Sequence, residues 1–242
     1  MDFVGHLNFY NTSIMFEGSE EEQAAFLAAR VGKPTLIRDA RVAYGVHEFA
    51  EDSTALLADG VGFLLARSPS AVKDWTNVSE VQARFYEEAR ALVQQLLPTA
   101  TIPTISTHAY RREDIKDHHM VDGIMHGPCA GAVHSDHADF VSEDGRTVTR
   151  KFSDVMSLPN DRRILGVNVW RSVSPKPLAR FPLAVCDRTS IDRDDLEYDL
   201  NPNGGDPRFN MHNCKPNSGQ RWYHYSDMTR DEVLVFITYD SH

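Results

Sequence analysis

The residues most able to do chemistry lie in one short segment, residues 127–139. If this segment is a strand, His134 and Asp136 project from the same face, because side chains alternate along a strand. One imidazole and one carboxylate on a shared face are two of the three protein ligands of a non-haem Fe(II) centre, whose third ligand is a second histidine. Such a centre keeps metal positions open for a co-substrate and dioxygen, whereas a structural zinc site is closed. The spacing therefore predicts His134 and Asp136 as metal ligands.

The His-x-Asp spacing is not decisive by itself, because a second pair, His137 and Asp139, follows directly. The small residues at 130–132 favour the first pair, since they let the backbone approach a bound group closely. A second metal interpretation stays open, because residues 134–137 match the second half of the His-x-His-x-Asp-His motif of dinuclear zinc hydrolases. Ala132 stands where that motif has its first histidine, so the match is incomplete.

Other residue types exclude several classes of chemistry. No serine or cysteine lies in a nucleophile elbow, and no glycine-rich loop leads into a helix, so acyl transfer and nucleotide binding have no support. The three cysteines, Cys129, Cys186 and Cys214, are widely spaced and odd in number. They therefore indicate neither a disulfide framework nor a thiolate zinc site.

The composition describes a globular, acidic chain. Its 242 residues include 25 Lys and Arg against 35 Asp and Glu, a formal net charge of −10 with neutral histidines. An acidic balance argues against a nucleic-acid partner, because phosphate backbones bind basic faces. No stretch approaches the roughly 20 apolar residues that cross a bilayer, and the first residues lack the pattern of a signal peptide. We therefore expect a soluble cytoplasmic protein that acts on a small molecule without a membrane partner, and the sequence leaves its oligomeric state open.

The first part of the chain, residues 1–103, has the pattern of mixed helix and strand. Ser79 and Gln82 have the spacing of a capping box, apolar residues then recur every three or four positions, and Pro98 follows. This pattern predicts a helix over residues 79–97. Shorter patterns predict helices over 19–30 and 53–59 and a strand over 61–66.

After Pro103 the helical period disappears and short β-rich runs follow. The predicted strands are 104–110, 130–134, 146–152, 164–171, 183–186 and 233–239. The stretch 192–219 is rich in Asp, Asn, Gly and Pro, so we expect it to lie outside the core. Strands without long intervening helices imply an α+β fold that is mainly β, with an antiparallel sheet or a jelly-roll barrel and helices on one side.

Seven stretches form a further pattern between residues 59 and 241. They are residues 59–63, 107–112, 127–136, 168–171, 182–187, 222–232 and 239–241. Asn-Val-Trp-Arg at 168–171 and Tyr-Asp-Ser at 239–241 are the most specific of them. In this order the stretches resemble the AsaB-like hydroxylase/desaturase family, which includes the cephem methoxylase component and gibberellin desaturase.

The resemblance implies a double-stranded β-helix, jelly-roll or cupin-like, with flanking helices. It also implies an Fe(II)- and 2-oxoglutarate-dependent dioxygenase that uses O₂ in specialised metabolism, by hydroxylation, desaturation or oxidative cyclisation. Iron ligation then falls on His134 and Asp136. The implied organisation is a single oxygenase domain over residues 1–242, in which residues 1–103 pack on a β-barrel core formed by residues 104–242.

The chain departs from the family pattern in two places. His137 stands where the family has glutamine or another polar residue. In the family, the distal ligand histidine and the arginine that anchors 2-oxoglutarate both follow the Tyr-Asp-Ser motif, whereas this sequence ends at His242. Either the barrel core is truncated at its C-terminal end, or the site is completed differently, with His242 as the candidate third ligand.

Three more residues are predicted to bind the co-substrate. Arg111 and Arg171 could hold a carboxylate through a bidentate fork, and Asn168 could donate a hydrogen bond to one. The arginines could equally pair with the many acidic residues, and Asn168 could satisfy a strand end. Two other functions stay open: a catalytically silent barrel that binds a small molecule, and a zinc-dependent hydrolase.

Overall fold

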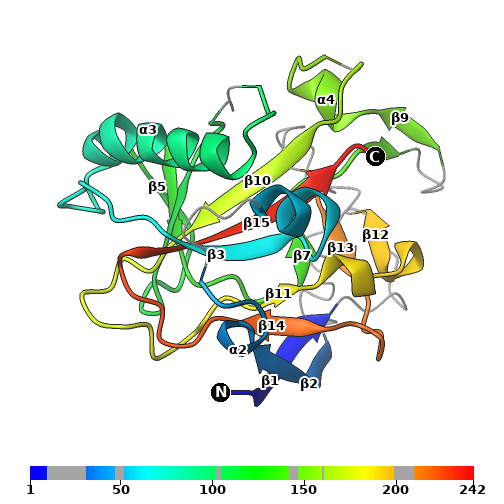
Figure 1. Cartoon of the computed structure of the whole chain (residues 1–242), viewed down its shortest axis with the longest axis horizontal. Helices are drawn as coiled ribbons and strands as arrows, with labels where there is room; N and C mark the ends of the chain where they lie inside the picture. The colour runs from blue at the N-terminus through cyan, green and yellow to red at the C-terminus, as the bar shows by residue number, and fades with distance from the viewer. Residues whose placement is uncertain (10–30, 47–51, 102–104, 142–146, 160, 199–209) are drawn as a thin grey trace.

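The computed structural model describes residues 1–9, 31–46, 52–101, 105–141, 147–159, 161–198 and 210–242. The described chain is mainly β, with few helices (Figure 1). Its strands are β1 (Phe3–Phe9), β2 (Val31–Asp39), β3 (Phe63–Arg67), β4 (Ala109–Arg111), β5 (His119–Val121), β6 (Ile124–Gly127), β7 (His134–Ser135), β8 (Phe140–Val141), β9 (Val148–Arg150), β10 (Leu165–Trp170), β11 (Val185–Cys186), β12 (Leu196–Tyr198), β13 (His212–Cys214), β14 (Trp222–His224) and β15 (Glu232–Asp240). Its helical elements are α2 (Ala40–Tyr44), the π-helix η1 (Ala55–Asp59), α3 (Val78–Leu96), α4 (Phe152–Val155) and the 3₁₀ turns η2 (Arg188–Ser190) and η3 (Arg193–Asp195).

The central sheet has the order β10-β15-β3 and is antiparallel throughout. In Figure 1 it crosses the middle of the molecule, with α3 above it. Both faces of this sheet are covered, which explains why β3 is a continuous apolar run rather than an alternating one. One face packs on α3 and η1 through Leu64, Leu92, Leu96 and Val235.

The opposite face of the central sheet packs on a second sheet, of order β1-β2-β14-β11. Phe63 and Leu65 of β3 and Leu234 of β15 form one cluster with Val185 of β11 and Tyr223 of β14. This cluster lies between the two sheets. Within the second sheet β2 and β14 run parallel, whereas the other pairs are antiparallel.

Three small sheets complete the described fold, with orders β12-β13-β7, β4-β6-β5 and β8-β9. The described strands therefore lie in five separate sheets, not in one closed barrel. Strands from residues 1–103 share sheets with later strands, because β2 pairs with β14 and β3 pairs with β15.

The prediction of a mainly β fold is confirmed, and so are the long apolar patterns. The helix predicted over 79–97 is α3, but Asn77 caps it in place of Ser79, because the Asn77 side chain accepts from the backbone N–H of Glu80 at 3.0 Å. The strands predicted over 61–66, 164–171, 183–186 and 233–239 correspond to β3, β10, β11 and β15.

Several shorter predictions need correction. The strand predicted over 146–152 is only β9, because the carboxylate of Asp154 accepts from the backbone N–H of Lys151 and the chain turns into α4. The stretch 192–219 contains β12 and β13, and Asn213 and Cys214 are buried, so part of it belongs to the core. The strands predicted over 104–110 and 130–134 are reduced to β4 and β7. The helix predicted over 19–30 lies outside the described residues.

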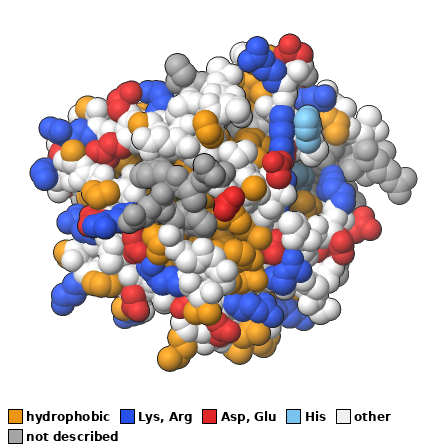
Figure 2. Space-filling view, in the orientation of Figure 1, with side chains coloured by type: hydrophobic (Ala, Val, Ile, Leu, Met, Phe, Trp, Pro, Cys, Tyr) orange, Lys and Arg blue, Asp and Glu red, His pale blue; other side chains and the backbone are white. Residues whose placement is uncertain are grey.

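The surface carries mixed charges. On the described part of the face in Figure 2, acidic and basic side chains are interspersed with hydrophobic ones. None of the described helices is both long enough and apolar enough to cross a membrane.

Candidate metal centre

The predicted ligand segment is held between two sheets. Strand β7 contains only His134 and Ser135, and it pairs with β13 through Asn213 opposite His134. On its other side, the Ser135 hydroxyl donates to the carbonyl oxygen of Thr238 in the central sheet at 2.5 Å. A two-residue strand has little stability of its own, so these outside partners determine where His134 and Asp136 lie.

The structure brings His134 and Asp136 together. Nε2 of His134 lies 3.1 Å from Oδ1 of Asp136, and Nδ1 of His134 lies 2.8 Å from the carbonyl oxygen of Ala132. A carbonyl oxygen only accepts hydrogen bonds, so Nδ1 carries the ring proton. Nε2 is then the atom that faces the carboxylate, so the two side chains meet although Asp136 lies just beyond the end of β7.

The carboxylate of Asp136 has a second partner on the central sheet. The side-chain amide of Asn168 in β10 donates a hydrogen bond to Oδ2 of Asp136. Burial disfavours the charged carboxyl, but when His134 also carries a proton on Nε2, its hydrogen bond and charge, with the hydrogen bond from Asn168, outweigh burial and lower the pKa of Asp136. The site therefore favours a carboxylate over a carboxylic acid.

This donor set fits a metal cation. A neutral Nε2 and a carboxylate oxygen both present lone pairs, so their 3.1 Å approach is favourable only when they share a cation, either a proton or a metal ion. Two ligands at right angles, each about 2.1 Å from a metal ion, lie about 3.0 Å apart. The two side chains are 27% and 37% exposed, so an ion can reach them from solvent. One imidazole and one carboxylate are ligands that suit Fe(II).

A third protein ligand does not join this pair among the described residues. No group of three His, Cys, Asp or Glu side chains in the described ranges could hold a metal ion. His242 was the candidate from the sequence, and the structure does not bring it to the pair; its backbone N–H instead donates to Oδ1 of Asp240 at 3.2 Å.

His137 has a different environment from His134. Its Nδ1 lies 2.9 Å from the hydroxyl of Thr238, and its ring packs at 4.7 Å from the ring of Phe152. Burial lowers the pKa of His137, and the nearby charge of Asp136 only partly opposes this. The His-Ser-Asp-His segment therefore does not converge on one point, which counts against the dinuclear zinc interpretation.

The two predicted arginines are engaged elsewhere. Nη1 of Arg111 lies 2.8 Å from Nε2 of His118 and donates to the carbonyl oxygen of Pro128 at 3.3 Å. Arg171 is buried, and its guanidinium lies about 5 Å from the ring centroids of Trp75 and Phe85.

Arg171 also holds the backbone around it. It donates to the carbonyl oxygens of Ser68 and Arg230, and burial lowers its pKa to about 10. Phe85 belongs to α3, so this arginine lies on the helix-covered side of the central sheet. These contacts count against Arg171 as a ligand of the co-substrate.

Sequence reasoning did not identify Thr238, which positions both Ser135 and His137. Its signal is present in retrospect, because it is a polar residue inside the apolar run Val233–Tyr239. The carbonyl of Ala132 could not have been found, since any residue supplies a carbonyl.

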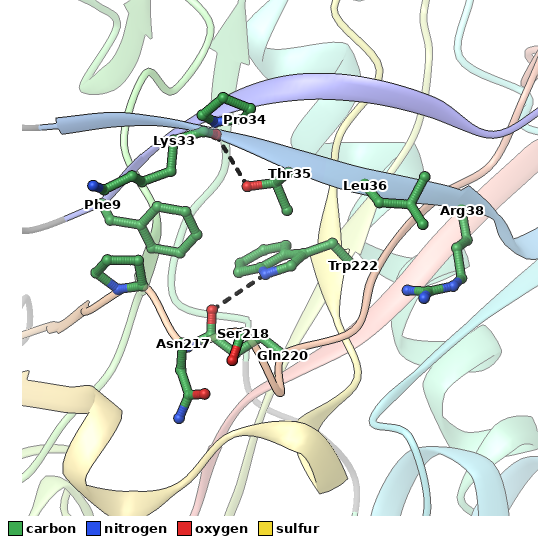
Figure 3. A pocket seen from close by; sticks show the side chains of 11 residues that line it. Phe9, Lys33, Pro34, Thr35, Leu36, Arg38, Asn217, Ser218, Gln220 and Trp222 are labelled. Atoms are coloured by element: carbon green, nitrogen blue, oxygen red, sulfur yellow. Dashed lines mark hydrogen bonds between the residues drawn. The ribbon is translucent and has the colours of Figure 1, made fainter.

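A groove of about 450 Å³ lies at a different place in the fold (Figure 3). Phe9 and Trp222 lie at its centre, with β2 on one side and the segment 216–220 on the other. Two of its polar side chains have hydrogen-bond partners: Trp222 donates to Gln220, and Asn217 donates to Asp195. None of the predicted site residues lines this groove.

Comparisons with known proteins agree with the motif pattern. The family model described as oxidoreductase/YMDC permease-like domain matches residues 7–242. The chain is 27% identical over 231 residues to the hydroxylase/desaturase efuI of Hormonema carpetanum, covering 86% of this chain and 72% of the relative. It is 39% identical over 89 residues to the hydroxylase/desaturase asaB of Aspergillus flavus, covering 31% and 37% of the two chains. The predicted resemblance to AsaB-like hydroxylase/desaturases is confirmed.

Solved structures with the same fold include the iron and alpha-ketoglutarate-dependent endoperoxidase NvfI. One structure of that enzyme aligns with a TM-score of 0.64 at 20% identity and covers 100% of this chain and 83% of the other. A structure of the same enzyme in a different conformation gives a TM-score of 0.66 at 18% identity and covers 85% of that chain. At these identities the likeness establishes the fold.

Proposed function

Because the chain belongs to the family described as the oxidoreductase/YMDC permease-like domain, we propose that it is a non-haem Fe(II)- and 2-oxoglutarate-dependent oxygenase. Its substrate would be a small molecule of specialised metabolism, oxidised by hydroxylation, desaturation or oxidative cyclisation. The two named hydroxylase/desaturase relatives support this proposal, and so does the fold shared with an iron and alpha-ketoglutarate-dependent enzyme. We take the two facing sheets as the sides of a jelly-roll.

One observation carries the proposal: Nε2 of His134 faces Oδ1 of Asp136 at 3.1 Å. In this proposal His134 and Asp136 hold the iron. Ala132 fixes the tautomer of His134, and Asn168 holds the carboxylate of Asp136. The pair supplies one negative charge, so a divalent cation keeps a positive charge that attracts an anionic co-substrate.

When bound, iron and 2-oxoglutarate would supply an oxidant derived from O₂ that removes hydrogen from the substrate. The chain's own residues keep the geometry fixed and limit water on one side. The rings of His137, Phe152 and Tyr239 pack in a row at tilted angles, with centroids 4.7 and 4.9 Å apart, and His137 directly follows Asp136 in sequence. We expect this aromatic row to shield one side of the pair from water.

Anaerobic reconstitution tests the proposal. Adding Fe(II) and 2-oxoglutarate to the protein should produce a weak visible charge-transfer band that needs both components. The band should disappear in His134→Ala and Asp136→Ala and persist in His6→Ala, which removes an exposed histidine of β1. A wild-type protein without the band would refute the oxygenase proposal. Retention of two zinc ions per chain would favour the hydrolase, and ligand binding without metal would favour the silent barrel.

A further inference from the structure

The two oxygens of the Asp136 carboxylate have different partners. Oδ1 faces Nε2 of His134 at 3.1 Å, whereas Oδ2 accepts a hydrogen bond from the side-chain amide of Asn168. A carboxylate can only accept, so the amide must present its NH₂ group, not its oxygen. Each residue of the pair thus has one atom held by the protein and one atom directed at its neighbour.

The position of Asn168 in β10 is unusual for a polar residue. Its neighbours Val167 and Val169 pack on the helix-covered side of the central sheet. Asn168 faces the other side, as does Trp170, which packs in the cluster between the sheets. A polar side chain there loses hydration, so it needs a specific partner. Asp136 is the hydrogen-bond partner that the structure gives it.

A shift in strand register lies next to Asn168. The pairing of β10 with β15 shifts between Gly166 and Val167, after which Asn168 lies opposite Phe236. The extra residue of this bulge is Thr238 of β15, because Tyr239 lies opposite Gly166 and Ile237 lies opposite Val167. The space at Gly166 is tight, because a Cβ atom there would lie 3.0 Å from Cβ of Tyr239 and 3.1 Å from Oγ1 of Thr238. The alternation of side chains along β10 is unbroken, so Asn168 points to the face opposite Val167 and Val169, where its amide reaches Asp136.

We propose that Asn168 is a positioning residue that keeps Asp136 a one-oxygen metal ligand. This inference rests on the proposed function, because it assumes that His134 and Asp136 bind a metal ion. An oxygen that already accepts an N–H hydrogen bond is a poorer metal ligand than a free one, so the amide of Asn168 disfavours metal binding through Oδ2. A carboxylate that bound through both oxygens would occupy one more of the six positions around an octahedral ion. The amide thus preserves an open position for co-substrate or dioxygen.

This role differs from the one expected from the sequence. Asn168 was predicted to hydrogen-bond the carboxylate of the co-substrate. In the structure it bonds a carboxylate of the protein, and its effect on the reaction runs through Asp136.

Metal titration of the full chain tests the inference without any turnover. Mn²⁺ binding would be followed by electron paramagnetic resonance, and the visible spectrum of the Co²⁺-loaded protein would report coordination number. Asn168→Leu keeps the size of the side chain but removes the donor. We expect it to weaken Mn²⁺ binding about 10- to 100-fold, the range found for residues that orient metal ligands. We also expect altered Co²⁺ bands, which a purely structural role would not produce.

Two companion variants complete the design. Asn168→Ser, whose hydroxyl is too short to replace the amide, should show the same two changes, and it decides the question if the leucine variant does not fold. Asn217→Leu is the matched control, because Asn217 donates to Asp195 at 2.9 Å in the same way but lies at the groove of Figure 3. It should leave Mn²⁺ affinity and the Co²⁺ spectrum unchanged.

The outcomes separate the two proposals. If the wild-type chain binds neither ion, both the metal centre and the role of Asn168 are wrong. If the wild-type chain binds metal but the folded Asn168 variants match it in affinity and spectrum, the metal centre stands and the positioning role is refuted.

Discussion

Replacing Asp240 with asparagine should destabilise the protein by about 2 kcal/mol at pH 7. The Asp240 carboxylate, at the end of β15, accepts from Nε and Nη2 of Arg163 at 2.9 and 2.7 Å and from Nη1 of Arg188 at 3.0 Å. It is 15% exposed, and the two arginines are 28% and 33% exposed. Hydrogen bonds to charged groups contribute about 1.5–3 kcal/mol each. Asparagine keeps one acceptor oxygen and water reaches both arginines, so the net loss is about 2 kcal/mol.

The pH dependence gives the prediction its sharpest form. Burial of the Asp240 carboxyl opposes its charge, but the arginine partners outweigh burial and lower its pKa. A carboxyl with a lowered pKa contributes stability above its unfolded pKa of about 3.9, and this contribution is lost as the pH falls through the folded pKa. Asparagine resembles the protonated acid. The difference in free energy of unfolding between wild type and Asp240→Asn should therefore be constant above about pH 4 and should shrink as the pH falls further towards the lowered folded pKa.

Urea unfolding at several pH values between 7 and 3 measures this difference, and a thermal scan at pH 7 should show a Tm lower by about 4–8 °C. Asp59→Asn is the matched control, because Asp59 also pairs with Arg163, at 2.8 Å, but is 64% exposed. Exposed pairs contribute about 0–1 kcal/mol, so this variant should be nearly neutral. A difference for Asp240→Asn that is the same at pH 7 and pH 3 would refute the ionic explanation.

Two other predictions concern the cap of α3 and a histidine of β13. Asn77→Ala should lower the free energy of unfolding by about 1 kcal/mol because it removes the cap of α3, whereas Ser79→Ala should have little effect. Urea titrations measure both values, and equal losses in the two variants would contradict Asn77 as the cap. Burial, reinforced by the charge of Arg193, lowers the pKa of His212 to about 4. The unfolded chain then binds a proton at His212 near pH 6.5, whereas the folded chain binds it only near pH 4. The free energy of unfolding of wild type should therefore fall by about 2–3 kcal/mol between pH 7 and pH 4, and that of His212→Asn should not show this fall. Parallel pH curves for the two proteins would contradict this.

The elements that could be predicted from the sequence are those whose own residues contain the pattern. Val81, Leu92 and Leu96 recur at helical spacing and are buried in α3, and the continuous apolar run of β3 matches its two covered faces. The cap was the uncertain part, because Asn77 and Ser79 are both good capping residues two positions apart. Local sequence cannot choose between them, whereas the geometry of the first turn does.

The short strands were beyond sequence reasoning because their stability comes from distant partners. β13 lies in a stretch rich in turn-forming residues, yet Asn213 pairs with His134 across nearly eighty positions of the chain. Two or three residues are too few to have a period. The same limit applies to the arginines. The guanidinium of Arg171 finds its hydrogen-bond and cation–π partners in carbonyl oxygens and aromatic rings of the protein. The residue type alone therefore does not decide whether an arginine faces a ligand or the helix side of the sheet.

The geometry of the candidate metal centre depends on β15 as much as on β7. Thr238 accepts the Ser135 hydroxyl through its carbonyl and contacts His137 through its own hydroxyl, so β15 fixes the residues on both sides of Asp136. Asp240, two residues further on, fixes the end of the same strand to Arg163 and Arg188. The ionic cluster therefore stabilises the frame on which His134 and Asp136 meet. Loosening it should weaken metal binding as well as folding, whereas Asn168 variants should affect metal binding far more than folding.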